Sequence, residues 1–207
     1  LVQRGIPVVG LAGSRVLPDI HCFVINDIEA GEQAARYLLS LGHRDIAFLG
    51  ARDSRTTELR YEGLCRVLKS AGVELNEALL VQVDSHEERD ALHGVTELLS
   101  RNVPFTAAVA FNDALALGVL SAFDDQGFMV PEDLSLMGFD DTISRYARPK
   151  ISTVASPKHE LGVQATNCLL QLIDGDQTPP TVHTLPGHLV IRQSTRRVET
   201  PQIALHS

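Results

Sequence analysis

The residues that most invite a chemical interpretation are two adjacent carboxylates, Asp140 and Asp141, which end the apolar run LSLMGF at residues 134–139. Paired acids at the end of a buried strand can form a catalytic pair, hold a metal, grip a neutral ligand or brace the next turn. A general acid/base pair needs two carboxylates that face each other across the reacting bond. Adjacent side chains diverge in direction, so the sequence disfavours a catalytic pair.

Other polar residues stand at matching places. Asp27, Asp84 and Asn112 each follow an apolar run, and Arg60 lies in the helix predicted after another such run. In an open sheet of parallel strands, ligands bind beyond the carboxyl ends of the strands. A carboxylate, a carboxamide and a planar guanidinium can together accept from and donate to a pair of hydroxyls. Asp140, Asn112 and Arg60 are therefore predicted to contact a sugar-like or nucleoside-like ligand.

Helix capping competes with this interpretation, because Asp and Asn are favoured N-caps at strand-to-helix junctions whatever the function. For Asp27, Asp113 and Asp141, capping or another structural role is favoured. The eight histidines show no HExxH or similar spacing, and neither a Gly-rich phosphate loop nor a GxSxG serine is present. The sequence thus predicts no metal site, no cofactor and no catalytic residue.

Apolar strand segments alternate along the chain with amphipathic helix patterns. Gly42, Gly72, Gly127 and Gly175 each stand where a helix should end. Continuous Val, Ile, Ala and Leu strands predict an α/β fold with parallel sheets covered by helices on both faces. Strands are predicted at 6–11, 22–25, 45–50, 79–83, 107–111, 134–139, 182–185 and 189–192, and helices at 27–42, 157–175 and through 59–68, 91–99 and 115–123.

The bulk composition is that of an ordinary globular chain, with 207 residues, 44% of them hydrophobic and 21% charged. Its net charge of −8 argues against this chain gripping nucleic acid by itself, since such binding needs a basic surface. Cys22, Cys65 and Cys168 lack metal-ligand spacing and are typical of buried thiols in a reducing compartment. No signal peptide or membrane span is visible, and the apolar opening resembles the middle of a domain.

Three longer blocks carry a resemblance to a known family. They read GEQAARYLLSLGHRDIAFLG, AFNDALALGVLSAFDDQGFMVPEDLSLMGFDD and PKISTVASPKHELGVQA. Over residues 5–196 the chain closely resembles the lactose/galactose-repressor (LacI/GalR) family of bacterial transcription regulators. The resemblance implies a two-lobed effector domain with the type I periplasmic-binding-protein-like fold, in which a small ligand closes the lobes and changes the affinity for DNA.

The family pattern also implies how this chain divides. A helix-turn-helix domain that binds operator DNA, a hinge and about half of the amino-terminal lobe would precede this sequence, so the first lobe is expected to be incomplete. The remainder of that lobe is expected at residues 1–24 and 157–186. The second lobe is expected at 25–156 and 187–197, followed by a tail at 198–207.

The resemblance assigns roles residue by residue. Arg60 in ELRYEG matches the family's effector-gripping arginine, while Asn112 in FND and Asp140 in FDD match effector contacts. Asp141 is expected to cap or brace the following turn. The positions that often line the pocket are occupied here by Thr56, Asp84, Ser85 and Lys158.

Several positions depart from the family's pattern. Ser85 stands where several relatives carry an aromatic residue, and Lys158 stands where some carry Phe. Ala12 replaces an acid used by some sugar-binding members, and Ile28 replaces a common Asn. These departures leave the class of ligand open.

Three functions remain in competition. The favoured one is the effector-binding and dimerisation domain of a cytoplasmic regulator that forms a homodimer and has no contact with a membrane. The alternative is a periplasmic sugar-binding protein of a transport system. The third is a hydrolase or nucleotide enzyme on a similar sheet. The VPEDLSLMGFDD block and the unpaired cysteines favour the regulator.

Overall fold

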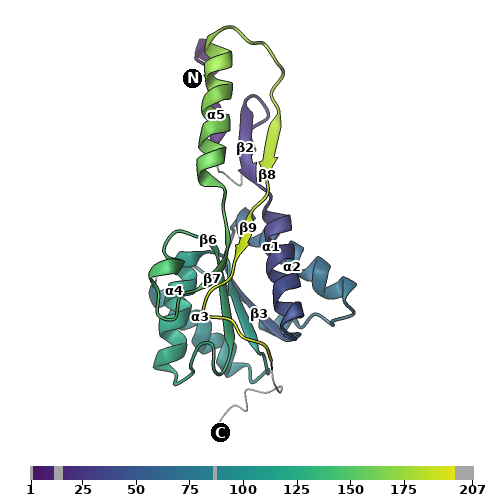
Figure 1. The fold of residues 1–207 in the computed structure, drawn as a ribbon, viewed down its shortest axis with the longest axis vertical. Helices are drawn as coiled ribbons and strands as arrows, with labels where there is room; N and C mark the ends of the chain where they lie inside the picture. Colours follow the sequence, from purple (N-terminus) through teal and green to yellow (C-terminus); the bar gives the residue numbers. More distant parts are fainter. Residues whose placement is uncertain (1, 12–15, 86–87, 199–207) are drawn as a thin grey trace. The chain divides into compact units, whose positions relative to one another are not determined.

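The computed structural model describes residues 2–11, 16–85 and 88–198, and the chain divides into two compact units. The first unit joins the start of the chain, as far as Asn26, to Ser156–Gly187. The second joins Asp27–Ala155 to the segment that begins at His188. Figure 1 traces the chain through both units. Ala12 and residues 199–207 of the expected tail lie outside the described residues.

The second unit is built on a six-stranded sheet with helices on both faces. Five neighbouring strands are parallel, and the last, β9, runs antiparallel to β7. Helices α1 and α2 cover one face, and α3 and α4 cover the other (Figure 1). In sheet order the strands are β4 (Leu80–Val83), β3 (Ile46–Ala51), β5 (Ala107–Ala110), β6 (Ser135–Asp140), β7 (Ser152–Ala155) and β9 (His188–Val190); the helices are α1 (Asp27–Ser40), α2 (Arg55–Ser70), α3 (Glu88–Ser100) and α4 (Asp113–Asp125).

Uniformly apolar strands explain this layered core. All four residues of β5 are buried, as are the first five of β3, because helices cover the sheet on both sides. Phe48, Phe105, Phe123 and Phe139 are among the largest fully buried side chains. Burying each such ring contributes about 1.5–3 kcal/mol, so this core supplies most of the unit's stability.

Helices α1 and α2 cross with their backbones in contact. A Cβ atom added at Gly31 would stand 2.0 Å from the carbonyl oxygen of Arg60, and one added at Gly63 would stand 2.0 Å from that of Ile28. Only glycine permits so close an approach. The crossing brings the middle of α2 against the first turns of α1.

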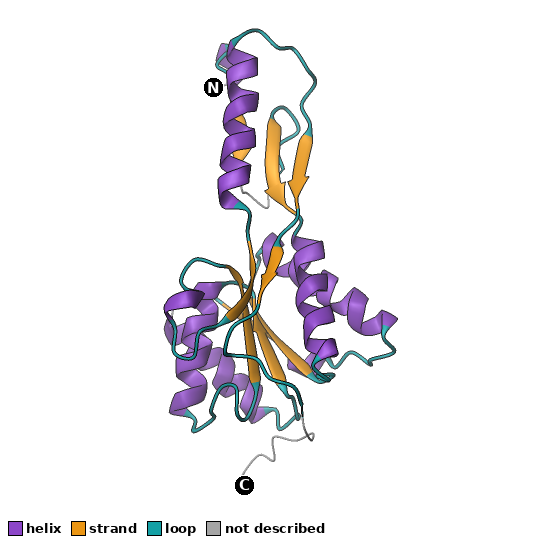
Figure 2. Cartoon of the chain, viewed as in Figure 1, coloured by secondary structure: helices purple, strands orange, loops and turns teal. Residues whose placement is uncertain are grey.

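The first unit is a small parallel sheet with one helix packed on it. Helix α5 contacts β1 and β2, and their shared core consists of Phe23, Leu161, Ala165 and Leu185. Figure 2 shows the helix lying along the strands. The strands, in sheet order, are β1 (Val9–Leu11), β2 (His21–Ile25) and β8 (Val182–Leu185), and α5 spans Lys158–Ile173.

The structure confirms the α/β class and the predicted helix ends, because Gly42, Gly72, Gly127 and Gly175 all have positive φ angles between 68° and 97°. Three short 3-10 helices, which the sequence did not predict, complete the described elements at Val2–Arg4, Glu77–Leu79 and Ser144–Tyr146.

Three strand predictions need correction. The first strand begins at Val9 and not at residue 6, since Pro7 cannot donate a ladder hydrogen bond. The sequence did not predict β7, because its STVA residues include two hydroxyls that suggest a loop. The last strand runs antiparallel, at His188–Val190 instead of 189–192, so the sheet is not wholly parallel. No helix in the described ranges is long and apolar enough to cross a bilayer.

Candidate functional site

The predicted site residues of the second unit gather at one edge of its sheet. Asp84 and Ser85 follow β4, Thr56 lies in the first turn of α2 after β3, Asn112 follows β5, and Asp140 ends β6. These four strands are neighbours and run parallel, so their carboxyl ends share this edge. The sequence therefore predicted this part of the geometry, because chain direction alone places these residues.

Arg60 lies at the base of this edge and is only 4% exposed. Its Nε donates to Oδ1 of Asp27 at 2.8 Å, and one terminal nitrogen donates to Oδ1 of Asp140 at 3.1 Å. The other terminal nitrogen donates to the backbone carbonyl of Phe111, and the guanidinium lies 4.5 Å from the centroid of the Phe139 ring. We call Asp27, Arg60 and Asp140 the Arg60 bridge.

The Arg60 bridge carries a net negative charge, because one guanidinium serves two carboxylates. Asp27 is 8% exposed, whereas the Asp140 side chain is 27% exposed. Burial raises the pKa of Asp27 above its ordinary value, although the charge and hydrogen bond of Arg60 act in the opposite direction. Asp140 is thus the member of the bridge that presents an acceptor to solvent.

The backbone at the two acids is strained. Asp140 has φ +95° and Asp141 has φ +50°, in the left-handed region that residues with a Cβ rarely adopt. Such conformations cost on the order of 1–3 kcal/mol each and cluster at ligand sites and switches. The backbone therefore leaves the regular path of a strand at Asp140.

Asp141 and Asp113 hold this strained turn in place. Asp141 Oδ1 accepts from Arg192 at 2.7 Å and from the Ser144 hydroxyl at 3.2 Å, so it braces the turn as predicted. Asp113 Oδ2 accepts from the backbone N–H groups of Thr142 and Ser144. Burial acts to raise the pKa of Asp141, but the hydrogen bond and charge of Arg192, with Ser144 and Arg145, outweigh it and lower that pKa.

The residue that caps α4 is Asn112 and not its neighbour Asp113. Asn112, which was favoured as a ligand contact, is the N-cap of α4, and its Oδ1 accepts from the backbone N–H of Leu115 at 2.8 Å. The cap uses the oxygen of the Asn112 side chain and not its two N–H donors. Asp113 and Asp27 were expected to cap helices or to have another structural role, and each has a structural role: Asp113 accepts from the turn after β6, and Asp27 pairs with Arg60.

The outer part of the edge is polar and exposed. Asp84 accepts from Nε of Arg52 at 3.2 Å, and the Ser85 hydroxyl donates to Asp90. Arg52 was not predicted as a site residue, since nothing in its spacing distinguishes it. An exposed ion pair such as that of Arg52 with Asp84 contributes little stability, so moving these two side chains costs little free energy.

Two further residues complete the comparison with the predicted set. Lys158 begins α5 in the first unit, whereas the other predicted residues lie in the second, so its part in the site stays a prediction. Thr57, which was not predicted, is buried, and its hydroxyl oxygen accepts from the backbone N–H of Ala51. A sequence signal could not have separated these two adjacent threonines.

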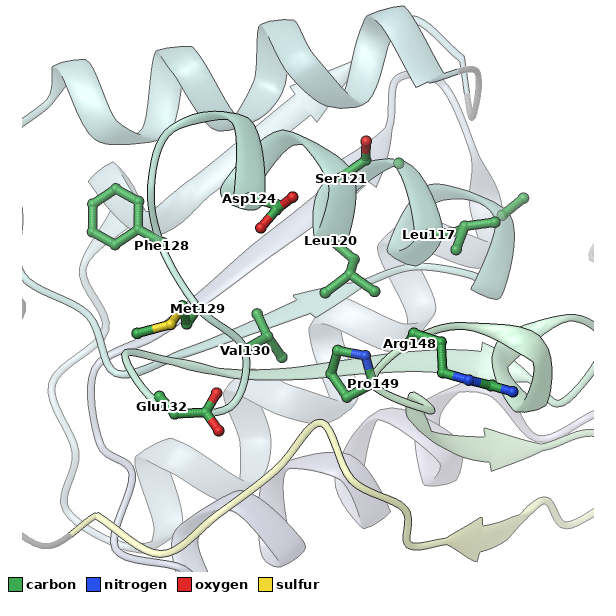
Figure 3. A pocket seen from close by; sticks show the side chains of 12 residues that line it. Leu117, Leu120, Ser121, Asp124, Phe128, Met129, Val130, Glu132, Arg148 and Pro149 are labelled. Atoms are coloured by element: carbon green, nitrogen blue, oxygen red, sulfur yellow. The ribbon is translucent and has the colours of Figure 1, made fainter.

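A separate pocket of about 710 Å³ lies over α4 and contains none of the predicted site residues. Figure 3 shows Phe128, Met129 and Val130 on one side of it and Arg148 and Pro149 on another. Met129 is 58% exposed. The remaining residues that line it are Ala114, Leu117, Gly118, Leu120, Ser121, Asp124 and Glu132.

The described ranges contain neither a cluster of possible metal ligands nor a disulfide bond. No group of three or more His, Cys, Asp or Glu side chains is arranged there to hold a metal ion. The thiols of Cys22, Cys65 and Cys168 are free.

Comparisons with known proteins agree with this geometry. The family model for a periplasmic binding protein-like domain matches residues 35–195. The HTH-type transcriptional regulator DegA of Bacillus subtilis is 36% identical over 202 residues, which cover 97% of this chain and 59% of DegA. The regulator GalR of Escherichia coli is 34% identical over 92% of this chain and 55% of its own length. The chain thus spans between half and three-fifths of these relatives.

Solved structures show the same likeness. A LacI family transcriptional regulator from Enterococcus faecium, solved with bound ribose, superposes with a TM-score of 0.87 at 27% identity. The match covers 96% of this chain and 74% of that one. The fold is therefore shared with a protein whose solved structure contains ribose.

Proposed function

Because the chain belongs to the LacI/GalR type of periplasmic binding protein-like domains, we propose that it is the effector-sensing part of a bacterial DNA-binding transcription regulator. Operator DNA would be bound by a helix-turn-helix domain that precedes this sequence. The chain's own charge of −8 is consistent with this division, since the DNA-binding surface would lie elsewhere.

The Arg60 bridge is the observation that carries the proposal. It places a solvent-reaching carboxylate at the carboxyl edge, on a strained backbone that two further acids brace. In the proposed site Asp140 accepts hydrogen bonds from ligand hydroxyls, and Asn112 donates from its amide. Thr56, Asp84, Ser85 and Lys158 complete the proposed contacts.

The charge of the bridge favours a neutral polyhydroxylated ligand over a phosphorylated one. Arg60 is already engaged by two carboxylates and a carbonyl, so it adds no excess positive charge for a phosphate. A phosphate close to Asp140 would meet like charge, which costs several kcal/mol in a partly buried site. The neighbour with bound ribose supports a sugar-like ligand.

We further propose that the protein is not an enzyme and acts in the cytoplasm. The adjacent acids do not form a catalytic pair, because Asp141 is committed to Arg192 and Ser144 while Asp140 pairs with Arg60. Relatives that are transcription regulators favour this reading over a periplasmic transport protein.

A homodimer is part of the proposal, with the pocket over α4 as its surface. The pocket combines exposed apolar side chains, including Leu117 and Met129, with acids at Asp124 and Glu132 and a base at Arg148. About a two-fold axis, the base of one copy would face an acid of the other. A patch of this kind could pair with a copy of itself through both its charges and its apolar side chains.

A ligand screen tests the function. The intact protein is heated in the presence of ribose, cellobiose or ribose 5-phosphate, each at saturating concentration. A neutral sugar that binds the folded state, present at a concentration of about 100 times its dissociation constant, stabilises that state by about 2.7 kcal/mol. The unfolding temperature therefore rises. A shift with ribose 5-phosphate alone would contradict the assignment to neutral sugars.

A further inference from the structure

Asp27 occupies an unusual place in the chain. It is the first residue of the second unit and of α1, directly after Asn26, whose backbone N–H donates to the carbonyl of Leu185 in the first unit. Its carboxylate is turned inward, at 8% exposed, and meets Arg60. A simple helix cap would not need this burial.

Arg60 joins Asp27 to Asp140 through one rigid group. The bond to Asp27 uses Nε and the bond to Asp140 uses a terminal nitrogen of the same planar guanidinium. The Phe111 carbonyl and the Phe139 ring hold the plane of that group. A shift of the guanidinium that lengthens one of the two bonds therefore changes the other.

The packing of α1 on α2 leaves little room for independent adjustment. At Gly31 and Gly63 the two backbones are in contact, one turn of helix from Asp27 and from Arg60 respectively. Close-packed elements of this kind transmit displacements instead of absorbing them. The position of Asp27 is thus tied to that of Arg60 by backbone packing as well as by the ion pair.

We infer that Asp27 is a positioning residue of the effector site, which sets how firmly Arg60 holds Asp140 and links that bond to the point where the chain enters the second unit. When a ligand takes up the lone pairs of Asp140, Arg60 turns toward Asp27 and the first turn of α1. When Asp27 is uncharged, Asp140 is the one carboxylate partner left to Arg60 among the described residues, and it is less available to a ligand. The ligand part of this inference rests on the proposed function.

The first test needs no ligand. Amide hydrogen exchange is measured on the intact protein, on Asp27→Asn and on Glu32→Gln. The control removes the same charge from the same helix, at an exposed pair with Arg36. We expect Asp27→Asn alone to gain protection at residues 139–142, because Arg60 then holds Asp140 more firmly. Equal exchange there in the two variants would overturn the positioning role.

The second test adds ribose as the probe. Asp27→Asn should bind it about tenfold more weakly than the control, the lower end of what a charge-assisted hydrogen bond contributes. Ribose should slow exchange at residues 24–28 in the control but not in Asp27→Asn. Unchanged affinity and unchanged protection in Asp27→Asn would overturn the link. Failure of the unsubstituted protein to bind any neutral sugar would instead contradict the proposed function, while the ligand-free test still decides the positioning role.

A second variant covers the case in which Asp27→Asn does not fold. Asp27→Glu keeps the charge and moves it by one methylene, so the ion pair with Arg60 persists at a displaced position. We expect a smaller gain of protection at residues 139–142 in this variant. Exchange identical to that of the unsubstituted protein would contradict the inference.

Discussion

At the scale of single residues, the structure separates the two acids that end β6 into different roles. Asp140 is in the left-handed region and reaches solvent, while Asp141 is fixed by Arg192 and Ser144. The strain at Asp140 persists because the turn behind it is braced by several charge-assisted hydrogen bonds. The more exposed acid, Asp140, thus stands next to a turn that the less exposed acid, Asp141, braces.

The Asp141 brace predicts a loss of stability in acid. Its folded-state pKa lies below the ordinary value of 3.8, so its stabilisation is complete above that value and is lost as the pH falls through the folded pKa. We expect Asp141→Asn to destabilise the protein by about 1.5–3 kcal/mol at neutral pH and by less near pH 3. Urea unfolding at both pH values measures this. Arg145→Gln is the control, because it removes the weaker and more exposed partner of Asp141; an equal loss at both pH values would count against the brace.

Part of the residue-level picture follows from sequence and part does not. The carboxyl-edge position of Asp140, Asn112 and Asp84 follows from parallel strand direction, which the apolar runs disclose. The pairing of Asp27 with Arg60 does not follow, because it depends on how closely α1 crosses α2. Nor could the sequence decide which of Asn112 and Asp113 caps α4, since both residue types are favoured caps.

At the scale of the elements, uniformly apolar segments were the predictable ones. Strands β3 and β5 are buried throughout or nearly so, and their composition matches that environment. Strand β7 is equally buried but contains Ser152 and Thr153, whose hydroxyls find partners in Thr195 and Asp113. Its polar residues are satisfied by tertiary contacts, which a local pattern does not reveal.

The contact between α1 and α2 predicts that Gly31→Ala is disruptive. The new methyl group would stand 2.0 Å from a backbone oxygen, so the helices must separate and the Arg60 bridge must shift. We expect a loss of about 1–3 kcal/mol in the free energy of unfolding. Gly162→Ala in α5 is the matched control, since a Cβ there meets nothing within 4 Å and should be neutral or stabilising. Denaturant unfolding of both variants checks this, and equal stabilities would refute the close crossing.

His43 predicts a second pH effect at this scale. Its buried ring bonds to the Thr106 hydroxyl and to the carbonyl of Arg196, which fastens the segment after β9. Burial is the main cause that lowers the pKa of His43 below 6.5. Its stabilisation is therefore complete above that value and declines as the pH falls below it, because the unfolded chain takes up the proton more readily than the folded one. Urea unfolding near pH 7.5 and pH 5.5 should show this decline in the unsubstituted protein and a smaller one in His43→Gln; the same decline in both would contradict the assignment.

At the scale of the whole molecule, the proposed homodimer predicts a change of mass on substitution. Met129→Asp places a charge on the lining of the pocket over α4, so the intact protein should become monomeric at micromolar concentration. Ile191→Asp is the control, because Ile191 is similarly exposed in the same unit but does not line that pocket. Light scattering coupled to size exclusion measures the mass. A dimer that survives Met129→Asp would exclude this surface.

The measurement that tests the central claim most directly is calorimetric titration of the intact protein with ribose and with ribose 5-phosphate. The unsubstituted protein should bind the neutral sugar more tightly than the phosphate. Asp140→Asn should lower the affinity for the neutral sugar by about ten- to a hundredfold, the loss expected for a charge-assisted hydrogen bond. Glu62→Gln, an exposed acid paired with Arg66 on α2, should leave that affinity unchanged. Equal affinity for the neutral sugar in Asp140→Asn and in Glu62→Gln would contradict the assignment of the effector site to the carboxyl edge of the sheet.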